Sequence, residues 1–258
     1  MLMVLSPAKS LDFDTPARVK AYTLPDFLAQ SAELVQLLRA LSMQQVAKMM
    51  SLSDSLAALN VARYSAWHPD FNLTNAKQAM FAFNGDVYEG LSAATLSRED
   101  IDFAQQHLRI LSGLYGVLRP LDLIQPYRLE MSTPLRSDVG DTLYAFWDQV
   151  PTQQINLELG SHAHRVLINL ASEEYFKVIR PKFLESRICT PVFQDGKNGQ
   201  YKVVSVYAKR ARGLMARYII TKKIAEPEAL KAFDGEGYRY TPEVSDATKW
   251  VFRREQGV

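Results

Sequence analysis

The sequence predicts a single α+β domain over residues 1–258, with a mixed sheet surrounded by helices. Short apolar runs typical of buried strands alternate irregularly with amphipathic segments of helical period, without a regular strand–helix–strand repeat. No Pro-, Gly- or Ser-rich linker divides the chain. Its 258 residues can bury a large core, and its 47% hydrophobic content is that of a globular protein.

The N-terminal part is expected to contain a strand and two helices. Residues 1–5 form a short apolar run that ends at Ser6-Pro7, which indicates a buried strand. Pro25 is a good first residue for a helix, and Ser53 is a good N-cap for a second helix over 53–67. The apolar stripe of the first helix has helical spacing: Phe27, Leu34, Val35, Leu38 and Leu41.

The central part is expected to contain a strand and three helices. Residues 79–83 are apolar and precede Asn84-Gly85-Asp86, which predicts a buried strand closed by a turn. Ser97 followed by acidic residues predicts a helix start. Residues 108–124 have two glycines, Gly113 and Gly116, between apolar runs, which predicts helix, glycine turn, helix.

The C-terminal part is expected to supply further strands and one basic helix. Residues 166–170 read as an apolar strand, 188–193 and 201–207 as a hairpin, and 250–252 as a last edge strand. The basic helix begins at Ala208 in this interpretation.

Composition sets limits on the location and chemistry of the protein. The N-terminus lacks the basic region of a secretory signal, and no stretch approaches the roughly 20 apolar residues of a membrane span, so we expect a cytoplasmic protein. The single cysteine, Cys189, excludes an internal disulfide and is expected to be a buried, inert thiol. His162 and His164 have no nearby carboxylate, so neither metal nor cofactor is predicted.

Positive charge is concentrated in one segment of the chain. Residues 175–224 carry twelve Lys and Arg against two acids, a net charge of +10, whereas the whole chain nets +2. On the basic helix, Leu214, Met215, Tyr218 and Ile219 share one face, and the opposite face is cationic. This cationic face carries five Lys and Arg residues and no acid, which favours a phosphate-binding surface over a merely solvated one: Lys209, Arg210, Arg212, Arg217 and Lys223. Nucleic acid is therefore the first partner to test.

Two loops that follow predicted strands carry polar side chains suited to a site. Ser6-Pro-Ala-Lys9 follows the strand 1–5, and Asn169-Leu-Ala-Ser-Glu-Glu-Tyr-Phe-Lys177 follows the strand 166–170. Such loops bind anions or hold a nucleophile and a base, although Ser172 also reads simply as a helix N-cap. No motif identifies a reaction, so an enzyme acting on a nucleotide or damaged base stays an alternative to DNA binding. Its candidate residues are Ser6, Lys9, Asn169, Ser172, Glu173, Tyr175 and Lys209.

Several segments together resemble the bacterial YaaA family of peroxide stress response proteins along the whole chain. They are Ser-Pro-Ala-Lys at 6–9, Gly-Asp-Val-Tyr-Glu-Gly-Leu at 85–91, Leu-Ser-Gly-Leu-Tyr-Gly-Val-Leu-Arg-Pro-Leu-Asp at 111–122, Pro-Tyr-Arg-Leu-Glu-Met at 126–131, 169–177, and Ala-Lys-Arg-Ala-Arg-Gly-Leu-Met-Ala-Arg-Tyr-Ile-Ile at 208–220.

The resemblance implies a family-specific fold with a basic cleft, a helix-hairpin-helix element and binding to duplex, bubbled or branched DNA. It also implies protection of DNA during hydrogen peroxide stress and a role in limiting free intracellular iron. It implies neither catalytic residues nor a protein partner. The predicted DNA-binding residues are Lys9, Arg109, Gly113, Leu114, Tyr115, Gly116, Arg119, Arg128, Lys177, Lys182, Lys209, Arg210, Arg212 and Arg217.

Overall fold

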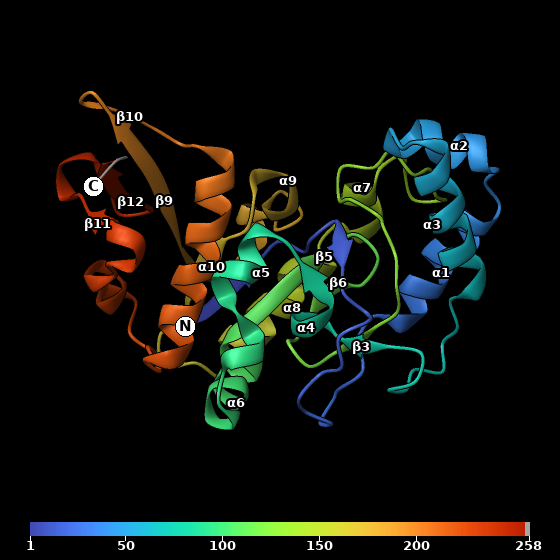
Figure 1. The fold of residues 1–258 in the computed structure, drawn as a ribbon, viewed down its shortest axis with the longest axis horizontal. Helices are drawn as coiled ribbons and strands as arrows, with labels where there is room; N and C mark the ends of the chain where they lie inside the picture. Colours follow the sequence, from blue (N-terminus) through green and yellow to red (C-terminus); the bar gives the residue numbers. More distant parts are fainter. Residues whose placement is uncertain (256–258) are drawn as a thin grey trace.

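The computed structural model describes residues 1–255 and has an eight-stranded mixed sheet at its centre (Figure 1). Parallel pairing runs through five neighbouring strands, and antiparallel strands lie at the edges. The spatial order is β11 (Arg239–Tyr240), β12 (Lys249–Glu255), β9 (Arg187–Lys197), β8 (Val166–Leu170), β1 (Leu2–Leu5), β5 (Leu108–Ser112) and β6 (Gly116–Leu118), with β10 (Gln200–Lys202) paired to β9. The predicted α+β class is confirmed.

The centre of the sheet is buried on both faces. Every residue of β1, β5 and β8 is buried, as expected for parallel strands covered by helices on each side. Met3 of β1 pairs with Leu108 of β5 and with Ile168 of β8. The predicted strands 1–5 and 166–170 are therefore confirmed. Two small sheets join β2 (Ser10–Leu11) to β4 (Phe83–Asn84) and β3 (Lys77–Gln78) to β7 (Leu123–Ile124).

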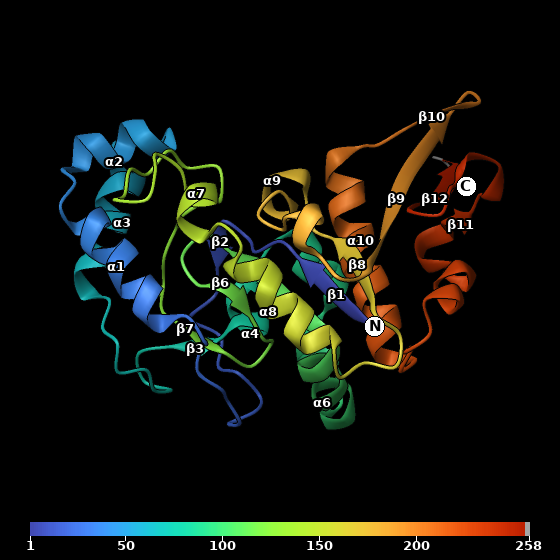
Figure 2. The same ribbon diagram turned by 180° about the vertical axis from the view of Figure 1, so that it is seen from behind.

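Helices cover the two faces and one end of the sheet. Helices α5, α6 and α10 lie on one face (Figure 1), α8 lies on the other, and α1–α3 gather at the β6 end (Figure 2). None of the helices in residues 1–255 has the length and apolarity that a membrane span requires. The helices are α1 (Leu28–Arg39), α2 (Met43–Met50), α3 (Asp54–Ala66), α4 (Ala79–Ala82), α5 (Asp86–Leu91), α6 (Arg98–His107), α7 (Leu143–Trp147), α8 (Val150–Leu159), α9 (Glu173–Phe176) and α10 (Ser205–Thr221), with short 3-10 turns η1 (Ala93–Thr95), η2 (Pro181–Phe183), η3 (Pro227–Ala232), η4 (Gly235–Gly237) and η5 (Pro242–Val244).

Predicted helix starts are confirmed where a capping residue marked them. The Ser53 hydroxyl accepts from the Leu56 amide at the start of α3. Ser97 and Asp100 form a capping box at the start of α6, which satisfies two backbone donors at once. The first long helix begins at Leu28, three residues after Pro25, and its Leu34, Val35 and Leu38 are buried as predicted.

Two predicted segments have a different secondary structure. Residues 79–82 form helix α4, flanked by the two-residue strands β3 and β4, so the predicted strand 79–83 is wrong. Residues 108–118 form the β5–β6 hairpin, so the predicted helix, glycine turn, helix is also wrong. Short apolar runs suit either structure. Pairing with β1 and β6 makes residues 108–112 a strand, whereas residues 79–82 are a helix between the paired strands β3 and β4.

The C-terminal predictions are right in type and wrong in extent. The hairpin exists, but β10 is only three residues long and α10 begins at Ser205 rather than Ala208. The predicted edge strand 250–252 is part of β12, which lies between β9 and β11 and is therefore an internal strand. Its Trp250, Val251 and Phe252 are buried accordingly.

Helices α5 and α10 touch along their backbones. A methyl group added at Gly213 of α10 would overlap the carbonyl oxygen of Val87, and one added at Gly90 of α5 would overlap the carbonyl oxygen of Arg210. Only glycine fits where two backbones approach this closely. The contact fixes the distance between the first turn of α5 and the N-terminal half of α10.

We predict that Gly213→Ala lowers the free energy of unfolding by about 3 kcal/mol, because the overlapping atoms belong to a backbone that cannot move aside cheaply. Urea denaturation followed by tryptophan fluorescence measures this loss. Gly199→Ala is the matched control: Gly199 has a φ of +75° and no heavy atom within 4 Å of an added methyl. It should cost only about 1 kcal/mol. Equal losses for the two variants would contradict the close-approach argument.

Candidate functional site

The two polar loops predicted from the sequence meet at the carboxyl ends of β1 and β8. The Ser6 hydroxyl accepts from the Ser172 amide at 2.9 Å and donates to the Ser172 hydroxyl at 3.2 Å. The Tyr88 hydroxyl donates to the Ser6 carbonyl oxygen at 3.0 Å. Since adjacent parallel strands end at the same edge of a sheet, residues 166 positions apart in the chain are held together.

A cavity of about 360 Å³ lies between these loops, the start of α5 and the N-terminal half of α10. Its volume falls in the range of small-molecule sites, roughly 300–1,000 Å³. It is lined by Ser6, Pro7, Ala8, Lys9, Ser10, Asn84, Gly85, Asp86, Val87, Tyr88, Leu170, Ser172, Glu174, Tyr175, Lys209 and Arg212.

Three cations from two distant parts of the chain line this cavity: Lys9, and Lys209 with Arg212. Lys9 lies 3.4 Å from a carboxylate oxygen of Glu130, and its side chain is 66% exposed. Lys209 is exposed, and Arg212 is half-buried one turn further along α10. Within residues 1–255, neither Lys209 nor Arg212 has an ion pair or a side-chain hydrogen bond. Burial lowers the pKa of Arg212, opposed in part by the charge of Glu173.

The lining of the cavity also includes two acidic residues, Glu174 and Asp86. Glu174 accepts from the amide and hydroxyl of Ser132 at 3.2 and 2.6 Å, so its carboxylate is already engaged. Asp86, in the first turn of α5, has no side-chain partner among the described residues. Glu130, the ion-pair partner of Lys9, also accepts a hydrogen bond from Arg128. The lining of the cavity therefore combines three cations with one carboxylate, that of Asp86, which has no side-chain partner among the described residues.

Of the polar residues in the loop after β8, Tyr175 lines the cavity, whereas Asn169 and Glu173 do not. Tyr175 lines the cavity, and burial raises the pKa of its phenol well above the ordinary value, so the group stays protonated. Asn169 does not line the cavity, and its amide oxygen accepts from the Ala171 amide at 3.0 Å. Glu173 begins α9 and does not line the cavity. Of the seven predicted enzyme candidates, Ser6, Lys9, Ser172, Tyr175 and Lys209 are brought together.

The other cations of α10 stabilise the fold. The Arg210 Nε lies 2.6 Å from Glu236, and a guanidinium nitrogen of Arg217 donates to the carbonyl oxygens of Leu91 and Ser92 at 3.0 and 3.1 Å. The spacing of seven residues predicts that Arg210 and Arg217 contact successive phosphates. Both side chains instead have partners within the molecule, because α10 packs against α5 and η4.

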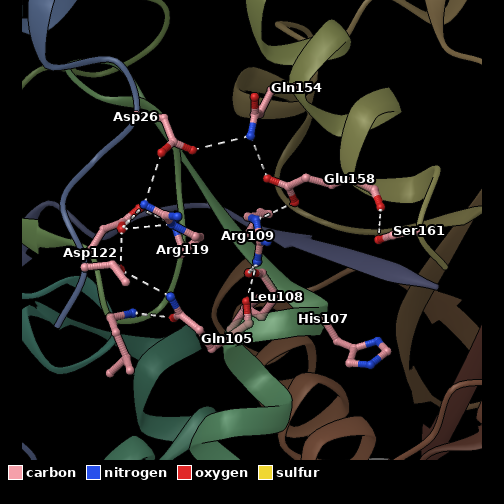
Figure 3. Close-up of polar contacts among 12 residues, drawn as sticks. Asp26, Gln105, His107, Leu108, Arg109, Arg119, Asp122, Gln154, Glu158 and Ser161 are labelled. Atoms are coloured by element: carbon pink, nitrogen blue, oxygen red, sulfur yellow. Dashed lines mark hydrogen bonds and ion pairs between the residues drawn. The ribbon is translucent and has the colours of Figure 1, made fainter. Parts of the chain in front are cut away.

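Arg109 and Arg119 belong to an internal ion network (Figure 3). Arg109 is only 6% exposed, and its Nε lies 2.5 Å from Glu158 of α8. Arg119 pairs with Asp122 at 3.0 Å and with Asp26 at 3.1 Å. Their charges are neutralised inside the molecule and are not presented at the cavity.

The turn 113–116 is buried in the core. Leu114 and Tyr115 are 0% exposed, and the Gly113 carbonyl oxygen accepts from the Trp147 indole at 2.9 Å. The Ser112 hydroxyl accepts from the Tyr115 amide at 3.0 Å. Buried backbone groups with partners inside the protein cannot hold a phosphate, which removes the reason for placing Gly113 to Gly116 in a DNA interface.

Two further predicted cations, Lys177 and Lys182, do not line the cavity. The Lys177 ammonium lies 4.9 Å above the ring of Tyr144, and the Lys182 ammonium lies 5.8 Å from the ring of Phe183. Sequence reasoning missed Asn84, Asp86 and Tyr88 as lining residues. Their signal was the turn sequence Asn84-Gly85-Asp86, which marks a chain reversal at an exposed end.

The remaining candidates for chemistry lie elsewhere. Cys189 is fully buried in β9, as predicted, and burial raises the pKa of its thiol to about 12. Residues 1–255 hold no group of three or more His, Cys, Asp or Glu side chains arranged to bind a metal ion.

Comparison with known proteins gives full-length matches. A family model described as peroxide stress protein YaaA matches residues 1–244. The chain is 60% identical over 255 residues to UPF0246 protein RSc2009 of Ralstonia nicotianae, covering 99% of each chain. It is 57% identical over 258 residues to a UPF0246 protein of Janthinobacterium sp. (strain Marseille), covering 100% of both, and 56% identical over 260 residues to UPF0246 protein azo1887 of Azoarcus sp. (strain BH72), covering 99% of this chain and 100% of the relative.

We predict that the folded protein protects Cys189 from thiol reagents. A pKa of about 12 leaves so little thiolate at pH 7 that labelling should be about 1,000-fold slower than that of a free cysteine. Absorbance with a disulfide reagent, with and without urea, measures the rate. Rapid labelling of the native protein would show that the thiol is accessible.

We predict that Arg212→Met leaves the free energy of unfolding within about 0.5 kcal/mol of the parent or raises it, because an unpaired, half-buried cation is removed. Arg119→Met is the matched control. It removes the partner of Asp122, whose side chain is 1% exposed, and should cost about 3 kcal/mol. Urea denaturation measures both, and a large loss at position 212 would indicate a structural role for Arg212.

Proposed function

Because the chain belongs to the peroxide stress protein YaaA family, we propose that it binds DNA without marked sequence preference and protects it during hydrogen peroxide stress. One observation carries the DNA-binding part. Lys9 and Lys209, 200 residues apart in the chain, line one cavity together with Arg212, which forms no ion pair with an acid among residues 1–255. Desolvating a cation without a partner costs free energy, and an anionic ligand offsets that cost.

The proposed interface consists of Lys9, Lys209 and Arg212 in the cavity, and it includes the exposed Lys177 and Lys182, which do not line the cavity. Lysine and arginine contacts to phosphates supply affinity through counterion release and carry no base information. Such an interface predicts steep salt dependence and little difference between sequences. The role in limiting free iron, which the family resemblance implies, stays a prediction.

A second candidate function is an enzyme acting on a nucleotide or a damaged base. The convergence of Lys9 and Lys209 on one cavity favours it, since both lysines are among the candidate residues for such an enzyme. Imine formation requires a desolvated lysine, whereas the Lys9 side chain is 66% exposed and pairs with Glu130. Borohydride trapping on lesion-bearing duplex tests this function directly, and we rank it below DNA binding.

We predict that Lys9→Ala with Lys209→Ala lowers the slope of log affinity against log salt by about 2, because each lysine neutralises about one phosphate. Fluorescence anisotropy with labelled duplexes of two unrelated sequences, across a salt series, measures the slope. Both sequences should lose affinity equally.

Lys222→Ala is the matched control, because Lys222 lies at the far end of the same helix, about 20 Å along its axis from Lys209. It should leave the slope within about 0.5 of the parent value. Salt-insensitive binding by the parent, or an equal change in the control, would contradict the proposed interface.

A further inference from the structure

We propose that the cavity at the ends of β1 and β8 binds a single unpaired nucleotide, with its phosphate at Arg212 and Lys209 and its sugar and base toward Asp86 and Asn84. This inference rests on the proposed function and narrows its ligand. A flat cationic face would hold only backbone phosphates, whereas this cavity is a hollow lined by cationic, acidic and aromatic residues.

Three lining residues have donors available for a phosphate. Arg212 and Lys209 form no ion pair or side-chain hydrogen bond within residues 1–255, and Ser172 lines the same cavity. The Ser172 oxygen accepts from the Ser6 hydroxyl at 3.2 Å and from the Tyr175 amide at 3.5 Å. Both acceptor positions of that oxygen are then occupied, so its own proton is left to donate. Two cations and a hydroxyl donor match a phosphate group.

Two other lining residues, Asp86 and Asn84, suit a sugar and a base. The carboxylate of Asp86 and the side-chain amide of Asn84 have no side-chain hydrogen bond to another described residue, and both line the cavity. A free carboxylate repels phosphate, but it accepts hydrogen bonds from sugar hydroxyls or from an exocyclic amino group. The aromatic residues Tyr88 and Tyr175, with Pro7 and Val87, add apolar wall against which a base can pack.

The size of the cavity excludes a paired base. A volume of about 360 Å³ lies near the lower limit of small-molecule sites and leaves no room for a base pair with two backbones. The nucleotide must therefore be free in solution, at a strand end, or extruded from a helix, as enzymes that act on single bases require. The two sources, free nucleotide and unpaired nucleotide in a strand, share this chemistry.

The first experiment is calorimetric titration of the full chain with 2′-deoxyadenosine 5′-monophosphate, deoxyadenosine and inorganic phosphate. The monophosphate should bind most tightly, because it alone has both a phosphate for Arg212 and Lys209 and a sugar and base for Asp86 and Asn84. Arg212→Met should weaken monophosphate binding by about tenfold or more, and Lys222→Ala should leave it unchanged. Thermal melting of each variant shows that it is folded, and Arg212→Lys should recover part of the affinity.

Asp86→Asn separates a nucleotide site from a simple anion site. Removing the carboxylate should strengthen the binding of inorganic phosphate, because a repulsive charge is lost. The same change should weaken binding of the monophosphate by about fivefold, because a sugar or base partner is lost. Opposite signs support the proposal, and equal changes in both ligands would overturn it.

The second experiment compares an intact duplex with a duplex that carries one unpaired nucleotide. If the unpaired nucleotide enters the cavity, it should raise affinity about tenfold in the parent and not in Arg212→Met. If the protein prefers the duplex with an unpaired nucleotide and does not bind the free monophosphate, the ligand is a nucleotide within a strand. If it binds the free monophosphate without that preference, the ligand is a free nucleotide. No DNA binding with intact monophosphate binding would refute the proposed function alone. DNA binding with neither monophosphate binding nor the preference would refute this inference alone.

Discussion

The cavity depends on the close approach of α5 and α10 at Gly90 and Gly213. These helices meet backbone to backbone, so the first turn of α5 faces the cationic turn of α10 at a fixed separation. Asp86 and Arg212 thereby line the same hollow at the ends of β1 and β8. Larger residues at the two glycines would push the helices apart and open the cavity. The charge arrangement therefore follows from packing at two positions that carry no charge.

The cations of this chain divide into two classes by their partners. Arg109, Arg119 and Arg217 are engaged inside the molecule, with carboxylates or with helix-end carbonyl oxygens. Lys209 and Arg212, which lie on the same helix as Arg217, form no ion pair or side-chain hydrogen bond among residues 1–255. Charge density in the sequence thus overstates the binding surface, because half-buried arginines also close helix ends and neutralise acids. An arginine left half-buried and unpaired is the more specific sign of a site, since folding alone gains nothing from it.

Sequence reasoning succeeded where a local signal was sufficient. Capping serines at 53, 97 and 172 and the apolar runs 1–5 and 166–170 gave elements of the right type, and the loops after those two strands gave half of the cavity. It failed at 79–83 and 108–124, where short apolar runs between glycines or turns fit helix and strand equally. At 108–112 pairing with the distant strand β1 decided the outcome, and at 79–82 a helix connects the two paired strands β3 and β4. The α5 wall was missed because only long-range helix packing brings Asp86 to the cavity.

A cationic surface and a nucleotide cavity would make different contributions to one complex. Contacts to phosphates supply affinity that falls with salt and is the same for every sequence. A cavity that admits one unpaired nucleotide adds a term that depends on how easily the helix releases it. That term is smallest for intact duplex and grows at gaps, ends and damaged pairs, where unstacking costs less. Such a protein would select the state of DNA rather than its sequence. Since Cys189 is buried with a strongly raised pKa, selection of that kind needs no peroxide-reactive thiol in the protein.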